Sequence, residues 1–138
     1  MAKRLSIVAS IIIVALGIAV LHGSSSVAKD SRCFELRTYT TPPGKLDALH
    51  ARFRDHTSAL FVKHGMTIIG YWEPADVPDT LIYMLAYKDR QSREVAWKAF
   101  QADPEWIKAR AASEVNGGSL TTKVESVFLA ATDYSPMK

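Results

Sequence analysis

The chain has 138 residues with 17 basic and 14 acidic side chains, a length that suits one domain and is short for two. Lys3 and Arg4 stand in an N-terminal segment without acidic residues, so the net charge of +3 falls to +1 beyond it. The lack of any run of Lys or Arg then argues against a nucleic-acid partner, and the single cysteine, Cys33, excludes a disulfide within the chain.

The N-terminus begins with a basic head, an apolar run and a stretch of small residues. Residues 1–4 are the basic head, 5–21 are almost wholly apolar, and Ser26 and Ala28 are small residues two apart. This order is typical of a secretory signal, residues 1–28, cleaved after Ala28. Because the apolar run is slightly long for such a signal and slightly short for a membrane span, an uncleaved anchor is the alternative. Both predict an exported protein, either periplasmic or extracellular, or anchored to the membrane by residues 5–21.

The first half of the folded part predicts a strand, a helix and a second strand. Apolar and polar residues alternate in "CFELRTY", which indicates a strand over 33–39. After the break "TTPPG", apolar residues at steps of three and four predict a helix over 45–64. Gly65 stands where a left-handed cap ends a helix. "MTIIGYW" then predicts a strand over 66–72.

The second half predicts two more strands with two helices between them. "LIYMLAY" indicates a strand over 81–87, and Asp89 is suited to cap a helix that runs to about Ala102. Asp103 followed by proline favours a further short helix over 104–115. "SLTTKVESVFLAA" predicts a last strand over 119–131.

The element order β-α-β-β-α-(α)-β predicts an α+β, ferredoxin-like fold with a four-stranded antiparallel sheet. We assign residues 29–32 to a linker, 33–132 to the domain and 133–138 to a C-terminal tail. Helices cover one face of such a sheet, yet strands such as 81–87 are apolar on both faces, which indicates burial of both. We therefore predict a homodimer whose two sheets enclose a shared cavity, a dimeric α/β barrel.

The strand over 33–39 carries the main candidates for ligand binding. We expect Phe34 and Leu36 to face the helices, which would place Glu35, Arg37 and Tyr39 in the shared cavity. A charged pair with a phenol can orient the polar or anionic end of a small, largely apolar molecule. The alternative is an ion pair at the dimer interface, either between Arg37 and Glu35 or between the two subunits.

Aromatic residues on the next strands are candidates for contacts with the body of that ligand. Trp72, Tyr83 and Tyr87 are expected to line the same space, together with Tyr71. Aromatic side chains at alternating strand positions also form ordinary hydrophobic core, which is the competing interpretation.

Three histidines, His50, His56 and His64, lie on the helix predicted over 45–64. Their spacings of six and eight turn them in different directions, so they predict no metal site. His64 is placed to interact with the helix C-terminus. His56 borders the apolar stripe and is the histidine best suited to proton transfer, with a packed, hydrogen-bonded histidine as the alternative. No cofactor is predicted, because the sequence has no phosphate-binding glycine loop, dinucleotide fingerprint or zinc signature.

Several short motifs together resemble the NIPSNAP family. The first half of the chain carries "ELRTY" (35–39), "PGKL" (43–46), "HT" (56–57), "KHG" (63–65) and "GYW" (70–72). The second half carries Tyr87, Asp89, "RE" (93–94), Phe100 and "DPEW" (103–106). The similarity covers nearly all of residues 34–131, and the combination is specific although each motif alone is not.

The resemblance implies the dimeric α/β-barrel architecture and leaves the activity open. NIPSNAP proteins have no agreed biochemical activity, and the mitochondrial partners of animal members do not fit a chain with a secretory signal. Members of the wider barrel superfamily include cofactor-free monooxygenases, haem-degrading enzymes and isomerases, an analogy of fold only.

Three functions are therefore compared. The first is an exported binding protein for a small, largely apolar ligand. The second is a cofactor-free or haem-related monooxygenase or isomerase, in which Arg37 stabilises an oxyanion and His56 or Tyr39 moves a proton. The third is a structural or interaction module held at the membrane.

Overall fold

The computed structural model describes residues 32–115 and 117–138. The predicted signal or anchor over 1–28, and the linker up to residue 31, lie outside the described residues. Within the described part of the chain, no helix is long and apolar enough to cross a membrane.

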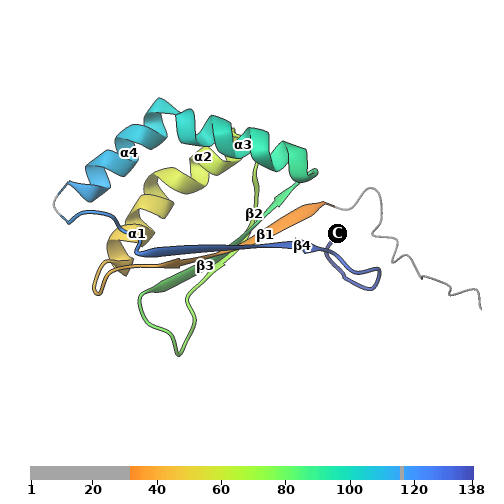
Figure 1. The fold of residues 1–138 in the computed structure, drawn as a ribbon, viewed down its shortest axis with the longest axis horizontal. Coiled ribbons are helices and arrows are strands. Elements are labelled where there is room, and N and C mark those ends of the chain that lie inside the picture. The colour runs from red at the N-terminus through yellow and green to blue at the C-terminus, as the bar shows by residue number, and fades with distance from the viewer. Residues whose placement is uncertain (1–31, 116) are drawn as a thin grey trace, which may run out of the picture.

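The four strands form one antiparallel sheet. They are β1 (Cys33–Thr40), β2 (Thr67–Trp72), β3 (Thr80–Tyr87) and β4 (Lys123–Ala130). Their spatial order is β2-β3-β1-β4, so the two strands that are most distant in sequence, β1 and β4, lie next to each other (Figure 1). The predicted α+β, ferredoxin-like sheet is confirmed.

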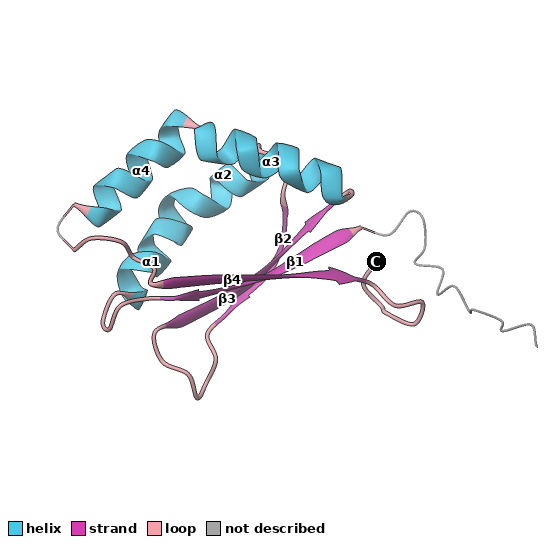
Figure 2. Cartoon of the chain, viewed as in Figure 1, coloured by secondary structure: helices cyan, strands magenta, loops and turns pink. Residues whose placement is uncertain are grey.

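The helices lie on one face of this sheet, as Figure 2 shows. They are α1 (Leu46–Arg52), η1 (Phe53–Thr57), α2 (Ser58–Lys63), α3 (Arg90–Ala102) and α4 (Pro104–Glu114). The caps predicted from sequence are confirmed: Gly65 has a φ of 78°, and Asp89 Oδ1 accepts a hydrogen bond from the Ser92 amide at 2.6 Å. Asp103 ends α3 and caps α4, where its carboxylate accepts from the Glu105 amide at 2.8 Å.

The helix predicted over 45–64 is continuous but contains a π-helical turn, η1. The Thr57 hydroxyl donates to the carbonyl oxygen of Arg52, five residues back, at 3.2 Å. A π turn widens the helix by one residue per turn, and such turns are frequent at functional sites. Apolar periodicity does not distinguish this turn from α-helix, so the sequence analysis missed it.

The last strand is shorter than predicted, because it begins at Lys123 and not at residue 119. The segment before it turns inward: Leu120 is 1% exposed, and the Thr122 amide donates to the carbonyl of Thr40 at 2.8 Å. In place of the predicted strand pairing, this segment therefore buries Leu120 under the helices and forms a hydrogen bond to the end of β1.

The assignment of sheet faces in β1 was wrong. Glu35, Arg37 and Tyr39 face the helices, and Phe34 and Leu36 lie on the opposite face, which the helices leave open. Phe34 is only 4% exposed on that face, where it lines a hollow with Met137 of the C-terminal segment. Alternation divides the residues of β1 into two sets but does not show which set faces the helices. The prediction from sequence placed the apolar set on the helix side. The polar set is buried because α3 supplies its partners, notably Arg93 and Trp97. The candidate site is therefore inside one subunit.

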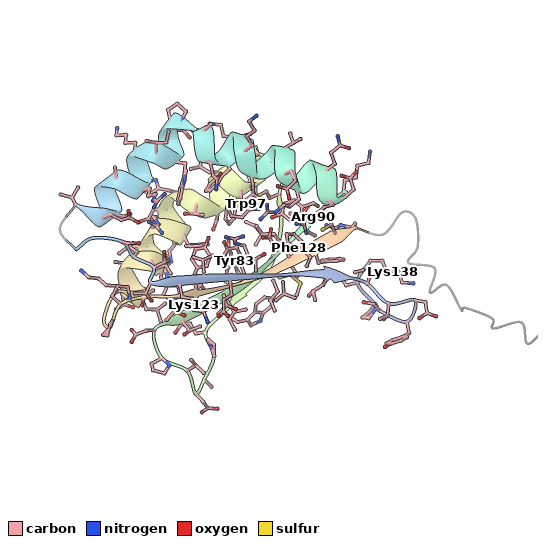
Figure 3. All side chains as sticks on the ribbon, viewed as in Figure 1. Tyr83, Arg90, Trp97, Lys123, Phe128 and Lys138 are labelled. Atoms are coloured by element: carbon pink, nitrogen blue, oxygen red, sulfur yellow. The ribbon has the colours of Figure 1, made fainter. Side chains whose placement is uncertain are left out.

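The core between the sheet and the helices is rich in aromatic rings. Tyr83 is fully buried, and its ring centroid lies 5.2 Å from that of Phe53 and 5.9 Å from that of Phe61. Figure 3 shows Tyr83 and Trp97 from opposite layers, both pointing into the space between sheet and helices. The buried aromatic cluster fixes the distance between the two layers and so frames the polar site beside it.

Candidate functional site

Glu35 is the centre of a buried hydrogen-bond network. Its side chain is fully buried, and its two oxygens accept six hydrogen bonds from five side chains. The donors are Arg37 at 2.6 Å, Arg93 at 2.7 and 3.0 Å, Ser126 at 2.6 Å, Tyr87 at 2.9 Å and Trp97 at 3.2 Å. A carboxylate has about four lone-pair sites, so these bonds use all of its accepting capacity.

This network keeps the Glu35 carboxylate ionised. Burial favours the neutral acid, but the hydrogen bonds from Arg93 and Ser126 and the charge of Arg37 outweigh it and lower the pKa of Glu35 from 4.5 to about 2. Burial, together with the Glu35 charge, raises the pKa of the Tyr87 phenol. Glu35 is thus a fixed negative charge that orients two arginines.

Arg37 is the residue through which this network reaches the cavity. Its Nη1 donates to Glu35, its Nε to the Tyr83 hydroxyl at 2.9 Å and its Nη2 to the Tyr39 hydroxyl at 3.2 Å. A guanidinium has five N–H groups, so one on each terminal nitrogen has no partner among the described residues. Burial alone would lower the pKa of Arg37, but the neighbouring oxygens of Tyr83, Tyr39 and Glu35 raise it, so the residue stays charged.

A cavity of about 530 Å³ lies next to Arg37, between the sheet and the helices. Its volume is in the range of small-molecule sites. The apolar wall is formed by Tyr39, Phe53, Phe61, Trp97, Phe100 and Trp106. The charged lining consists of Arg37, Arg52, Arg110 and Glu114, three cations against one anion. The arrangement suits an organic anion with an apolar body.

The predicted site residues are brought together only in part. Arg37 and Tyr39 line the cavity, whereas Tyr83 and Tyr87 are buried behind its wall and hold Arg37 and Glu35. Trp72, 49% exposed, pairs with Ile82 on the open face and does not reach the cavity. The aromatic candidates thus divide into core residues that support the site and one surface residue apart from it.

The histidines do not form a site together. His56 is exposed and lines a separate surface hollow between the first helix and α4, so the expected position at the edge of the core was wrong. His50 Nε2 lies 2.9 Å from Glu73 Oε1, and His64 Nε2 lies 2.7 Å from Asp103 Oδ2. His64 therefore joins the end of α2 to the start of α4. Among the described residues, no group of three or more His, Cys, Asp or Glu side chains is arranged to hold a metal ion.

Sequence patterns did not predict three arginines of the site, Arg52, Arg93 and Arg110. Arg93 forms the second half of the Glu35 network, and Arg52 lines the cavity with only 6% of its surface exposed. Arg52 follows Leu49 by three residues and so borders the buried stripe of the first helix. A charged residue at that position was the available signal.

Comparison with known proteins identifies the domain. The family model for NIPSNAP matches residues 34–136, which is most of the chain.

The protein belongs to the NIPSNAP family.

Solved structures of the family share its fold. A NIPSNAP family protein of unknown function from Agrobacterium tumefaciens is 19% identical, with 80% of this chain and 96% of that chain covered and a TM-score of 0.70. A second one from the same organism is 23% identical, with 78% and 99% covered and a TM-score of 0.69. Among curated proteins, none matches the chain. Family membership therefore establishes the fold and assigns no biochemical activity.

The NIPSNAP domain is also similar in fold to a protein from Nitrosomonas europaea, provisionally assigned as an antibiotic biosynthesis monooxygenase. That protein is 13% identical, with 80% of this chain and 97% of that chain covered and a TM-score of 0.57. At this level of identity the likeness concerns the fold alone. Any inference about function therefore rests on the residues of the site itself.

Proposed function

We propose that this NIPSNAP protein binds a small organic acid with a largely apolar body in the cavity between its sheet and helices. The observation that carries the proposal is the position of Arg37, a buried guanidinium at the wall of an aromatic cavity. Its only carboxylate partner among the described residues is Glu35, which also accepts hydrogen bonds from Arg93.

The geometry of Arg37 favours a carboxylate as the anionic group. Glu35, Tyr83 and Tyr39 fix the guanidinium from three sides, and each terminal nitrogen keeps one N–H for a ligand. Two N–H groups on a rigid planar fork match the two oxygens of a carboxylate. Trp97, whose ring lies 4.3 Å from the Arg37 Cζ, would contact the apolar body of the acid.

The proposal is tested by titrating the protein with aliphatic monocarboxylates and measuring heat of binding and tryptophan fluorescence. Trp97 and Trp106 line the cavity, so occupancy should change the emission. We expect Arg37→Gln to weaken binding by about tenfold or more, the effect of a lost charge-assisted hydrogen bond. Because this change disturbs a buried network, Ala111→Trp provides a second test, since Ala111 lines the cavity outside that network.

The matched control is Ala112→Trp, one residue further along α4, where the side chain lines a different surface hollow. The tryptophan at 111 should block binding, and the one at 112 should leave it within about twofold of the unmodified protein, the range of neutral surface changes. Equal binding by both variants, or no binding of monocarboxylates by the unmodified protein, would contradict the proposal.

Catalysis at the same cavity is a second candidate, favoured by the contact between Arg37 and the Tyr39 hydroxyl. Arg37 would stabilise an oxyanion as it develops, and the Tyr39 phenol would supply or accept the proton. His56 has no place in this hypothesis, because it lies outside the cavity. Loss of turnover in Tyr39→Phe with unchanged ligand affinity would support catalysis, whereas equal turnover would refute this role for Tyr39.

We also propose export and a homodimer. Export rests on the character of residues 1–28, and N-terminal sequencing of protein recovered from outside the cytoplasm tests it. The dimer rests on the open face of the sheet, where Leu36 lies between Met84 and Val127 in the register and Val127 is 53% exposed. A second copy packed on this row would remove it from water. The ligand cavity is inside each subunit and does not depend on the dimer.

A further inference from the structure

We infer that the cavity binds a dianion, an organic acid with one anionic group at Arg37 and a second at Arg52. This inference rests on the proposed function and names the class of ligand more narrowly. It is carried by a second cluster of charged residues at the cavity wall, in which two arginines share one glutamate and Arg52 keeps donors without a partner.

In both clusters two arginines share one glutamate. In the first, Arg37 and Arg93 bond Glu35, and Arg93 also bonds the exposed Glu94 at 3.3 Å. In the second, Arg52 Nη1 donates to Glu114 Oε1 at 3.0 Å, and Arg110 Nε lies 3.5 Å from Glu114 Oε2. The second cluster therefore has one positive charge in excess, and its residues all line the cavity.

Arg52 has a donor with no partner. Its side chain is 5% exposed, Nη1 bonds Glu114 and the Ser113 hydroxyl, and the Nε–H is buried without a partner among the described residues. A buried donor left unpaired costs free energy on the order of 1–3 kcal/mol, so such groups usually meet a ligand or water. The Nε–H itself is covered, but it belongs to a guanidinium that lines the cavity and whose Nη2 has no hydrogen-bond partner among the described residues.

The π turn accounts for the position of Arg52. In a regular α-helix, residues five apart point about 140° from each other, which would turn Arg52 away from Thr57. In a π turn, residues five apart are hydrogen-bonded and lie nearly above one another. Arg52, Phe53 and Thr57 consequently line the same cavity. The Thr57 hydroxyl, which donates to the Arg52 carbonyl, holds this turn.

The clusters are separated by a row of aromatic rings. Arg37 contacts Trp97, the Trp97 and Phe100 ring centroids lie 5.5 Å apart, the Phe100 and Trp106 centroids lie 4.5 Å apart, and the Arg52 Cζ lies 5.3 Å from the Trp106 ring. The two guanidinium groups thus contact the first and third rings of the row. All three rings line the cavity. A molecule with an apolar middle and an anionic group at each end matches this order of charges and rings.

The test compares linear dicarboxylates, from adipate to sebacate, with monocarboxylates of the same chain length, using heat of binding. Dicarboxylates of increasing length vary the separation of the two anionic groups, and the best-bound one matches the spacing of the two clusters. We expect one dicarboxylate to bind about tenfold or more tightly than its monocarboxylate, as one further charge-assisted contact predicts. Arg52→Gln should remove this preference, so that each dicarboxylate binds no more tightly than its matched monocarboxylate.

Glu114→Gln is a second variant with the opposite expected sign. It removes the negative charge shared by Arg52 and Arg110, so the preference for dicarboxylates over monocarboxylates should increase. Arg54→Gln, on the same helix but exposed, is the matched control for Arg52→Gln. It should keep the full dicarboxylate preference.

The outcomes separate this inference from the proposed function. Equal affinity for mono- and dicarboxylates at every length would overturn the second anion site and leave the proposed function standing. A dicarboxylate preference that persists in Arg52→Gln would overturn the assignment to Arg52. Absence of binding by either class would overturn both.

Discussion

Arg93 on α3 and Glu35 on β1 form a bidentate ion pair, with Nη2–Oε1 at 2.7 Å and Nε–Oε2 at 3.0 Å. The carboxylate is fully buried, and 58 residues of sequence separate the two partners. Since it joins the sheet to the helix layer, this pair both stabilises the domain and fixes the carboxylate that orients Arg37.

Removal of Arg93 should therefore destabilise the protein strongly. Breaking a buried ion pair from one side costs on the order of 3–5 kcal/mol, and we expect Arg93→Met to lower the free energy of unfolding by about this amount. Urea unfolding followed by circular dichroism measures it. Lys98→Met, at an exposed position on the same helix, is the control and should change stability by less than about 0.5 kcal/mol. Equal stability of the two variants would refute the structural importance of the pair.

The pKa of Glu35 predicts how stability falls in acid. Because its folded-state pKa is depressed from 4.5 to about 2, the stabilisation it contributes is fully present above pH 4.5. It is lost as the pH falls through this window toward 2. Unfolding free energy measured across that range should fall less steeply in Glu35→Gln than in the unmodified protein. Parallel curves would show that another group carries the acid sensitivity.

Asp103 should add to the same acid sensitivity from a different place. Hydrogen bonds from Lys63, His64 and the Glu105 amide lower the pKa of Asp103, and they join α2 to the start of α4.

Asp103→Asn keeps a capping oxygen and loses the charge, whereas Asp103→Ala loses both. We expect Ala to cost about 1 kcal/mol more than Asn, the usual value of an N-cap. Equal unfolding midpoints of the two variants would show that the cap contributes nothing.

The fold was largely predictable from the sequence, and the site was not. Strand alternation and helix periodicity are local, so β1, β2, β3, α3 and α4 were placed within about two residues. The burial of Glu35 and Arg37 depends on Arg93, which local patterns do not connect to them. Alternation therefore left the sheet face undecided, and we chose the wrong one.

The two missed features of the cavity have different causes. The π turn is invisible to periodicity, since Phe53, Thr57 and Leu60 follow one another at steps of four and three, which a regular α-helix also gives. Arg52 was visible as a charged residue beside Leu49, but its role depends on Glu114, 62 residues later. Long-range pairing of charges decides the site, whereas local sequence decides the elements.

The π turn itself should depend on the Thr57 hydroxyl. In Thr57→Val the bond to the Arg52 carbonyl is lost while the volume is kept, and we expect a loss of about 1 kcal/mol in unfolding free energy. Thr57→Ser keeps the hydroxyl and serves as the comparison for the methyl group. If valine is as stable as the unmodified protein, the hydroxyl does not hold the turn.

The open face of the sheet should govern self-association. Leu36, Met84 and Val127 are adjacent on this face, and the helices cover only the other one (Figures 1 and 2). A carboxylate introduced into an apolar interface would be buried without a partner, and an unpaired buried charge costs several kcal/mol. Val127→Glu should therefore produce monomers in light scattering at micromolar concentration. Val95→Glu provides the control, because Val95 is 65% exposed on α3, away from the sheet.

Ligand affinity tests whether the cavity within one subunit depends on the dimer. Since the cavity is formed within one subunit, Val127→Glu should bind carboxylates as tightly as the unmodified protein even where it no longer self-associates. A loss of affinity that parallels dissociation would show that the second copy completes the site. A monomeric unmodified protein would refute the dimer and leave the cavity argument intact.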